Sequence, residues 1–439
     1  MRRIGYTLRI VIFRQFVDED LGCASYLVGD AGEAVVVDPA FAIEQYQEAA
    51  AQEGVRIVRV LETHTHADHL SGHGRFALEH GLPVAIHPLG RPEYRFEPLE
   101  DGMTLHAGAV AIEVVHTPGH RPEHCSFVVD GKLVLTGDSL FVGDAARPDL
   151  AIEVHEGATD LHHSLERLAM LPDETVVYPG HVAGSLCGTY MSAAHSSSIG
   201  LEKQTNHALH SNLSEFVEES ASLSTPKPPT TERVVALNRG PWIGVRPALA
   251  ELDAPGDAVV LDVRPIDIFA AGHISGAISV ALDGGSFATR SAFVLDPAER
   301  VALHVRSRAE AAEASRLLTA VGLFEQCGFL LGDGTEVTRT LTVAELQQLD
   351  RDEQVLDVRE PSESPESGWL RIPYRLLRVA PPAELDASRP VYSICASGAR
   401  AVLATSLLAR QGFDARAIVG GGVEDVRTDA RYERWRSTG

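Results

Sequence analysis

The segment Thr63-His64-Thr65-His66-Ala67-Asp68-His69 decides how this chain is interpreted. It follows a β-branched run at residues 56–61 and offers four candidate metal ligands within six residues. A single histidine is more often a surface or packing residue than a ligand, but a set this dense rarely has only a structural purpose. The segment therefore predicts a metal site in the loop that follows a strand.

Three later β-rich runs also end in side chains that can bind a metal. These runs lead into His120 in Thr-Pro-Gly-His, Asp138 in Leu-Thr-Gly-Asp and His181 in Tyr-Pro-Gly-His. Stretches of helical composition, such as residues 42–54, lie between the β-rich runs. An α/β scaffold presents its site at strand ends, because the sheet is rigid and the exit loops vary. We expect an α/β domain with its site along one sheet edge.

Together these motifs resemble the metallo-β-lactamase superfamily over roughly residues 13–195, which implies an αββα sandwich. Narrower motifs resemble the persulfide dioxygenases within it, and they lie at residues 63–72, 117–124, 140–150 and 178–188. The chain departs from that pattern at Ala146, where the family usually has Gly, and at Arg121, where it usually has Thr. Neither departure removes a ligand, but both affect the shape of the pocket.

The resemblance implies one Fe(II) per chain, bound by His64, His120 and Asp138, with positions left open for substrate and dioxygen. The remaining polar residues are expected either to hydrogen-bond to these ligands or to hold a second metal. They are His66, Asp68, His69 and His181. Candidates for substrate contact are Arg147, Asp149 and Cys187, although Cys187 is equally well explained as a packing residue.

The implied reaction oxidises a low-molecular-weight thiol persulfide, of the glutathione or coenzyme A type, with O2 to give sulfite. Zinc-dependent thioester hydrolases of the glyoxalase II kind use the same ligand set for a dinuclear centre with a bridging hydroxide. Ligand identity alone does not separate the two readings. The dioxygenase is favoured by the segment at residues 140–150 and by the sulfur-handling modules described next.

An internal repeat occupies the second half of the chain. Leu-Asp-Val-Arg-Pro at residues 261–265 recurs as Leu-Asp-Val-Arg-Glu at residues 356–360, and each is followed by loop and helix signals. Farther along, residues 301–304 match residues 391–394, which sets Val305 opposite Cys395. The sequence predicts two similar α/β modules, of which only the second keeps a nucleophile.

The second module carries Cys395-Ala396-Ser397-Gly398-Ala399-Arg400 between an apolar strand and a helical run. A helix N-terminus and successive loop N–H groups stabilise a thiolate and a persulfide. Arg400 adds donors for an anionic sulfur substrate. We therefore predict a catalytic set of Cys395, Ser397, Gly398 and Arg400, with Cys395 as the nucleophile.

The repeat resembles a pair of rhodanese domains, the first degenerate and the second active. The whole chain is similar to bacterial persulfide dioxygenase–sulfurtransferase fusions of the CstB type, which act in sulfide detoxification. The expected domains are a metal-binding domain with a helical extension and linker at 1–240, a degenerate rhodanese at 241–337 and an active rhodanese at 338–439. Sulfite and thiosulfate join the persulfide and O2 as expected partners, and a homo-oligomer is compatible with the sequence. A non-enzymatic carrier of sulfane sulfur is a further alternative.

Composition supports this picture of a multidomain globular enzyme. The chain has 439 residues, more than one ordinary core requires, and no apolar run long enough to span a membrane. A net charge of -23 argues against nucleic acid as a partner. Five cysteines, an odd number in a long chain, favour a reducing cytoplasm over an oxidising compartment.

Overall fold

The computed structural model describes residues 11–30, 32–148, 153–182, 191–192, 194–222, 226–350, 352–363, 368–380 and 382–427. Two of the predicted substrate-contact residues, Asp149 and Cys187, lie outside these ranges. The chain forms two compact units, one of residues 1–246 with 320–322 and the other of residues 247–319 and 323–439. None of the helices within the described ranges is long and apolar enough to cross a membrane.

The N-terminal unit contains two six-stranded sheets. Their strand orders are β1-β2-β3-β4-β5-β6 and β14-β13-β10-β9-β8-β7. The first sheet consists of β1 (Ile12–Val17), β2 (Ala24–Gly29), β3 (Glu33–Val37), β4 (Arg56–Leu61), β5 (Val84–Ile86) and β6 (Glu97–Pro98). The second consists of β7 (Thr104–Ala107), β8 (Val110–His116), β9 (Cys125–Val129), β10 (Leu133–Gly137), β13 (Val176–Pro179) and β14 (Ser197–Ser198), and β11 (Leu140–Phe141) pairs separately with β12 (Asp144–Ala145).

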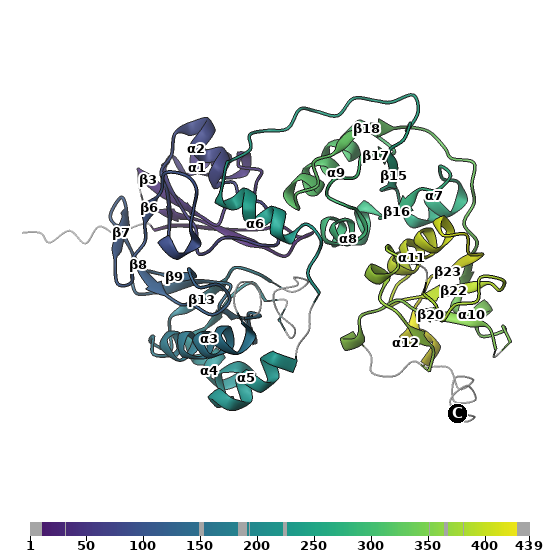
Figure 1. Ribbon diagram of the computed structural model, residues 1–439. Helices are drawn as coiled ribbons and strands as arrows, with labels where there is room; N and C mark the ends of the chain where they lie inside the picture. The colour runs from purple at the N-terminus through teal and green to yellow at the C-terminus, as the bar shows by residue number, and fades with distance from the viewer. Residues whose placement is uncertain are drawn as a thin grey trace, which may run out of the picture. The chain divides into compact units, whose positions relative to one another are not determined.

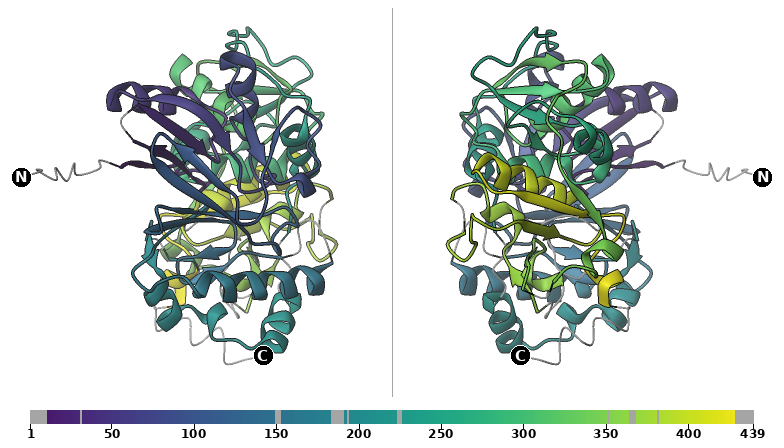
Figure 2. Two further views of the ribbon diagram at one scale, coloured as in Figure 1. Left: turned by 90° about the vertical axis from the view of Figure 1, so that its left-hand side faces the viewer. Right: turned by 90° about the vertical axis from the view of Figure 1, so that its right-hand side faces the viewer.

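Helices cover the outer face of each sheet, so that the unit has four layers (Figure 1). The helices are α1 (Glu44–Glu53), α2 (His73–His80), α3 (Val154–Ala169), α4 (Ile199–Thr205), α5 (Leu213–Ser222) and α6 (Thr231–Arg239). Tyr46 of α1 and Phe76 of α2 pack on the first sheet, while Leu161 of α3 and Phe216 of α5 pack on the second. In the left view of Figure 2 the purple and blue strands of the two sheets form separate layers. The predicted αββα sandwich is confirmed.

The sequence explains why these elements form. On α3, Ala158, Leu161, Leu165 and Leu168 are buried at a helical spacing, which gives the helix one apolar face. Along β8 buried and exposed residues largely alternate, as expected for a strand with one face on the core. A third apolar cluster, which includes residues of β2, β3, β9 and β10, fills the space between the two sheets. Burial of this apolar area is the main stabilising contribution to the sandwich.

The strand ends that carry polar residues share one edge of the sandwich. β3 and β4 pair in parallel, as do β10 and β13, so their carboxyl ends point the same way within each sheet. Asp38 follows β3, Asp138 follows β10, and the histidine-rich loop follows β4. This arrangement agrees with the sequence-based expectation of a site at a sheet edge.

The C-terminal unit contains two sheets of parallel strands in which equivalent strands follow the same order. The first sheet is β16-β15-β17-β18. The second sheet is β21-β20-β22-β23, and β19 is added at its end next to β23. The strands are β15 (Val259–Asp262), β16 (Ile278–Ser279), β17 (Val301–His304), β18 (Gln326–Leu330), β19 (Thr340–Thr342), β20 (Gln354–Asp357), β21 (Leu370–Arg371), β22 (Val391–Ile394) and β23 (Ala415–Val419). The helices are α7 (Ile266–Ala271), α8 (Phe287–Val294), α9 (Arg308–Ala320), α10 (Val343–Leu346), α11 (Ala399–Arg410) and α12 (Val423–Arg427).

Strand pairing confirms the register of the internal repeat. In the first module Asp262 of β15 lies opposite His304 of β17, and in the second Asp357 of β20 lies opposite Ile394 of β22. Val305 and Cys395 are the residues that follow β17 and β22. They therefore occupy equivalent positions in two copies of one α/β fold.

Candidate metal centre and sulfur-transfer loop

Three side chains from separate strand ends meet at the edge of the N-terminal sandwich. His64 lies in the loop after β4, His120 in the loop between β8 and β9, and Asp138 directly after β10. One candidate ligand atom from each of these residues lies within 4.8 Å of the others, and all three residues are buried. The structure thus brings together two imidazoles and one carboxylate.

The donor atoms of this cluster face one another without protein partners. His64 Nε2 and Asp138 Oδ2 are buried and have no hydrogen-bond partner among the described residues. His120 Nε2 lies 3.5 Å from Asp138 Oδ2. Buried polar atoms without partners are costly, and a metal ion would satisfy all three at once. The residues present therefore fit a bound divalent metal.

Hydrogen bonds on the far side of each imidazole fix its orientation. His64 Nδ1 lies 2.9 Å from Thr63 Oγ1, which itself donates to Asp38 Oδ2 at 2.8 Å. His120 Nδ1 lies 2.8 Å from the carbonyl oxygen of Arg147 and donates to it. In both rings the proton then sits on Nδ1, and the Nε2 lone pair is free for a metal. Burial lowers the pKa of both His64 and His120, which keeps the rings neutral.

His181, Asp68 and His69 form a hydrogen-bonded chain that ends on Asp138. His181 Nδ1 lies 2.7 Å from Asp138 Oδ1, and its Nε2 lies 2.8 Å from Asp68 Oδ2. His69 Nδ1 lies 3.1 Å from the other oxygen of Asp68. Burial alone would raise the pKa of Asp138, but neighbouring His181 holds that pKa well below its usual range. The chain keeps Asp138 ionised and orients its free Oδ2 toward the two histidines.

His66 belongs to a second buried cluster on the other side of the same loop. Its Nε2 lies 3.3 Å from both Asp38 Oδ1 and Glu62 Oε2. Candidate ligand atoms of these three residues lie within 4.8 Å of one another, and the same holds for His66, Asp68 and His69. The four additional residues predicted from sequence therefore divide between a chain on Asp138 and this buried cluster.

His124 and Gly137, which lie beside the three-residue site, were not predicted from the sequence. His124 is fully buried, and its Nε2 accepts a hydrogen bond from the backbone N–H of Asp138 at 2.9 Å. Burial lowers the pKa of His124 to about 3, so the ring remains a neutral acceptor. Gly137 precedes Asp138 with φ +50°, and a Cβ there would meet His124 Nε2 at 2.6 Å. The position of His124 within the motif at 117–124 was the available signal for its role.

Arg121 is a buried cation next to the candidate ligands. Its Nε donates to Glu123 Oε1 at 2.7 Å, and Glu123 also accepts from the backbone N–H of Thr65. Its positive charge is among the causes that lower the pKa of His64 and His120. Within the described ranges its terminal nitrogens have no protein hydrogen-bond partner, and they are not sealed from solvent. Arg121 thus offers free donors beside the cluster.

Cys395 in the second module is buried directly after β22. The backbone N–H of Gly398 donates to its Sγ at 3.1 Å, and helix α11 begins at the next residue. Gly398 has φ +103°, a conformation that side-chain-bearing residues rarely adopt. A Cβ on Gly422 would lie 2.1 Å from the carbonyl oxygen of Ala396, so the glycine-rich segment after β23 packs closely on this loop.

The other predicted residues of this loop differ in environment. Arg400, in the first turn of α11, forms a two-pronged ion pair with Glu363, with one N–O distance of 2.8 Å. Ser397 is exposed, whereas Gly398 is buried. Glu363 was not predicted, because nothing in the pattern links it to the loop. It fixes the direction of the guanidinium near Cys395.

Comparison with known proteins agrees with this geometry. The protein-family model described as "Metallo-beta-lactamase superfamily" matches residues 18–181. The family model described as "Rhodanese-like domain" matches residues 246–338, which form the module that carries Val305. A crystal structure of a metallo-beta-lactamase from Staphylococcus aureus superimposes with a TM-score of 0.68 at 28% identity, covering 73% of this chain and 98% of that one. The sandwich and its His–Asp cluster place the N-terminal unit in the metallo-β-lactamase superfamily.

Sequence relatives identify the family within this superfamily. The mitochondrial persulfide dioxygenase ETHE1 of Bos taurus is 30% identical over 235 residues, which cover 52% of this chain and 87% of that protein. A hydroxyacylglutathione hydrolase of Rhizobium johnstonii is 35% identical over 143 residues, covering 30% of this chain and 52% of that protein. The chain belongs to the ETHE1 family of persulfide dioxygenases, with rhodanese-like sequence joined after the metal-binding domain.

Proposed function

We propose that the N-terminal unit is a non-haem Fe(II) persulfide dioxygenase and that Cys395 of the last module transfers sulfane sulfur. The division is a metal-binding domain at 1–240, a degenerate rhodanese at 241–337 and an active rhodanese at 338–439. The observation that carries the proposal is the convergence of His64, His120 and Asp138, with His64 Nε2 and Asp138 Oδ2 lacking protein partners. Two imidazoles and one carboxylate are the ligand set of oxygen-activating non-haem iron.

The proposed reaction converts R-S-SH, O2 and water into R-SH, sulfite and two protons. When bound, Fe(II) would supply the redox chemistry that joins persulfide sulfur to oxygen. The protein orients the ligands through Thr63, the Arg147 carbonyl and His181. His181 also links Asp138 to Asp68, which gives a hydrogen-bonded path along which a proton can leave the buried site.

Arg121 supports an anionic substrate at this site. A persulfide is more readily ionised than a thiol and reaches the site as an anion, and the product sulfite is also an anion. Arg121 follows His120 in the chain, its charge acts on both His64 and His120, and its Nε bond to Glu123 holds the guanidinium in place. An arginine with free donors is well suited to such groups. Its presence where the family usually has Thr suggests a pocket adapted to an additional negative charge on the thiol carrier.

At the second site, the Cys395 thiolate attacks the outer sulfur of thiosulfate. The S–S bond of thiosulfate breaks, sulfite leaves with the bonding electron pair, and Cys395 becomes a persulfide. A low-molecular-weight thiolate then takes the sulfur, which regenerates Cys395. The Gly398 N–H and the start of α11 stabilise the negative charge on sulfur in each state.

The four described cysteines are unpaired, in agreement with the reducing cytoplasm we propose.

A zinc thioester hydrolase is a second candidate, favoured by the hydrolase relative and by the group His66, Asp68 and His69. It requires two metals per chain and no oxygen. Against it, both Asp68 oxygens are already engaged by His181 and His69. These contacts favour a single metal.

The decisive experiment measures metal content and oxygen uptake together. Protein prepared without oxygen is given glutathione persulfide, and sulfite formation is followed. We expect about one iron per chain, in line with a single two-His, one-carboxylate site, and persulfide-dependent oxygen consumption. About two zinc ions per chain with thioester hydrolysis and no oxygen uptake would establish the hydrolase instead.

Asp138→Ala then separates the two activities. The variant loses the only carboxylate of the proposed triad, so we expect no oxygen uptake and little bound iron. Thiosulfate-to-thiol sulfur transfer should persist at the wild-type rate, because Cys395 belongs to the other unit. Loss of both activities in a folded variant would contradict independent sites.

A further inference from the structure

The loop between β4 and α2 carries the candidate ligands but has little secondary structure of its own. Its side chains converge on the metal centre, so several of its backbone groups need partners elsewhere. His66 and His69 are both buried, and their carbonyl oxygens cannot rely on bulk water. The source of their hydrogen bonds therefore bears on how firmly the loop is held.

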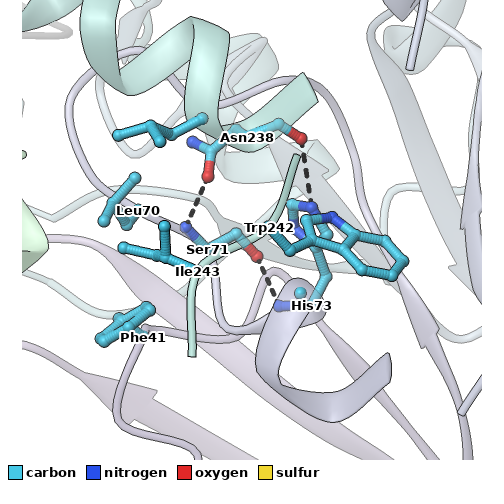
Figure 3. A pocket seen from close by; sticks show the side chains of 9 residues that line it. Phe41, Leu70, Ser71, His73, Asn238, Trp242 and Ile243 are labelled. Carbon is cyan, nitrogen blue, oxygen red and sulfur yellow. Dashed lines mark hydrogen bonds between the residues drawn. The ribbon is translucent and has the colours of Figure 1, made fainter. Parts of the chain in front are cut away.

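Asn238, in the last turn of α6, supplies those hydrogen bonds. Its Nδ2 donates to the carbonyl oxygens of His66 at 2.9 Å and of His69 at 2.8 Å. Its Oδ1 accepts from the backbone N–H of Ser71 at 3.0 Å, which Figure 3 shows. Asn238 is 4% exposed, so water does not compete for these bonds. One amide thus joins three backbone positions of the metal-binding loop.

A second connection runs from the backbone of Asn238 through buried side chains. Its carbonyl oxygen lies 3.1 Å from His73 Nε2 (Figure 3). His73 Nδ1 lies 3.4 Å from Glu62 Oε1. Ser71 Oγ donates to the same Glu62 oxygen at 2.7 Å, and the other oxygen of Glu62 faces His66. Helix α6 is therefore connected to His66 in two ways. Asn238 Nδ2 donates to the His66 carbonyl directly, and the Asn238 carbonyl is linked through His73 and Glu62 to the His66 ring.

Aromatic packing keeps the end of α6 against this loop. A Cβ on Gly74 of α2 would lie 2.7 Å from the Trp242 ring, so the two segments are in close contact. Trp242 also lies against Tyr94, with ring centroids 4.4 Å apart. Phe41, Leu70 and Ile243 line a small pocket between the end of α6 and the loop (Figure 3). The segment after the sandwich is thus docked as part of the N-terminal unit.

We propose that Asn238 is a positioning residue of the metal centre, acting through the backbone of the loop that carries His66, Asp68 and His69. It lies beyond residues 18–181, which match the superfamily model, and in the segment leading to the rhodanese modules. The inference rests on the proposed metal site but not on the oxygen chemistry. Under this proposal, the segment that joins the two units helps the N-terminal unit to bind its metal.

The test compares Asn238→Ala with Asn206→Ala in the full-length chain. Asn206 is another buried amide of the same unit, and its Nδ2 donates to the carbonyls of Phe141 at 3.3 Å and Asp144 at 2.9 Å and to Glu202 at 2.7 Å. Both variants lose a buried hydrogen-bonding group, so both should have a lower melting temperature. Only Asn238 touches the metal-binding loop, so only its loss should weaken metal binding.

Zinc affinity, measured by competition with a chromophoric chelator, is the first readout. We expect the dissociation constant of Asn238→Ala to rise about 10- to 100-fold, the usual effect of losing an outer hydrogen-bond partner of a metal site. The absorption bands of the Co(II)-substituted protein should shift as well, while Asn206→Ala keeps the wild-type affinity and spectrum. Equal weakening in both variants, or none in Asn238→Ala, would overturn the proposal.

Asn238→Asp provides the decision if the alanine variant does not fold. The aspartate keeps the shape and the acceptor for Ser71 but loses both donors to the carbonyls of His66 and His69. Wild-type zinc affinity in this variant would refute the role of the amide. Because zinc binding needs no redox chemistry, the two proposals can fail separately: an iron-loaded wild-type chain that consumes no oxygen with persulfide would refute the dioxygenase, and the difference in zinc affinity between the asparagine variants would still stand.

Discussion

The two rhodanese-like modules share a framework and differ in one loop. Each has a buried Asp–Arg pair after its first long strand, Asp262–Arg264 in one and Asp357–Arg359 in the other, with N–O distances of 2.6 and 2.7 Å. The loops after β17 and β22 differ in character, because Val305 and Arg308 stand where Cys395 and Gly398 do. The comparison teaches that the framework specifies the fold and the loop specifies the chemistry.

The backbone of the two loops differs as well as the side chains. Gly398 has φ +103° and directs its N–H at Cys395 Sγ, and α11 begins one residue later. Arg308, at the equivalent position, has no positive φ and already belongs to α9. The first module therefore lacks both the cysteine and the loop N–H that in the second module donates to it.

The largest expected effect is complete loss of sulfur transfer in Cys395→Ser. A serine hydroxyl cannot form the persulfide, while its size matches the buried site closely. Sulfite release from thiosulfate with an acceptor thiol should fall to the uncatalysed rate, and persulfide-dependent oxygen uptake should remain. Transfer that survives this substitution would show that the nucleophile lies elsewhere.

Removing the shared framework charge should destabilise either module strongly. Asp357→Asn leaves Arg359 buried without its carboxylate, and Asp262→Asn does the same to Arg264. Breaking a buried ion pair on one side costs about 3–5 kcal/mol. The urea-unfolding midpoint of the C-terminal unit should fall in both variants. A large fall in only one of them would mean that the two frameworks are not equivalent.

Gly398→Ala should damage the active loop with a smaller loss of stability. A side chain at φ +103° is strained, which costs about 1–3 kcal/mol. The N–H should turn away from Cys395 Sγ, so the rate of sulfur transfer should fall more than the unfolding midpoint predicts. Gly412→Ala is a control at similar φ (+90°), where a Cβ meets no atom within 4 Å. Equal effects on transfer in the two variants would rule out a special role for the Gly398 N–H.

The framework charges also predict how stability depends on pH. Burial alone would raise the pKa of Asp262 and of Asp357, but Arg264 with His304, and Arg359 with Arg371, lower these values below the usual range. Folding therefore favours the ionised carboxylates, and their contribution is complete above the unfolded value of about 3.9. It is lost as the pH falls through the lower folded values. Unfolding midpoints from pH 7 to pH 2 should show this decline, and Asp262→Asn should make it shallower.

The smallest expected effect is that of Val305→Cys in the first module. The new thiol would lack the Gly398-type N–H and the arginine at the position of Arg400, where this module has Glu310. In a Cys395→Ser background we expect no measurable sulfur transfer. Adding Arg308→Gly and Glu310→Arg should be needed before any activity appears. Activity in the single variant would show that the loop backbone matters less than the thiol.

Residues gathered in dense motifs or internal repeats could be predicted from the sequence. The αββα sandwich was implied by the resemblance of the ligand motifs to the metallo-β-lactamase superfamily, and the position of Val305 follows from the repeat register, which the strand pairing confirms. His64, His120 and Asp138 were singled out by motif, and the structure brings them together, although their role as ligands remains a prediction. Local pattern was sufficient where chemistry is carried by adjacent residues.

Residues that act across long separations could not be predicted. Asn238 is more than 165 residues from the loop it holds, and an asparagine in a short helix has no distinctive pattern. Glu363 meets Arg400 only because the fold brings η4 (Pro361–Glu363) to the start of α11. His124 lay in a recognised motif, but its bond to the backbone of Asp138 depends on the geometry of β9 and β10. These contacts are products of tertiary packing.

Helix α6 bears on how such a metal domain can be transplanted between proteins. A cassette cut at residue 181, where the superfamily match ends, would leave behind the amide that satisfies the carbonyls of His66 and His69. Its metal-binding loop would then have two buried acceptors without donors. A recombination junction placed after Ile243 would carry the helix and Trp242 along. For this chain, the boundary at which the metal-binding domain can be exchanged lies about sixty residues beyond the end of the superfamily match.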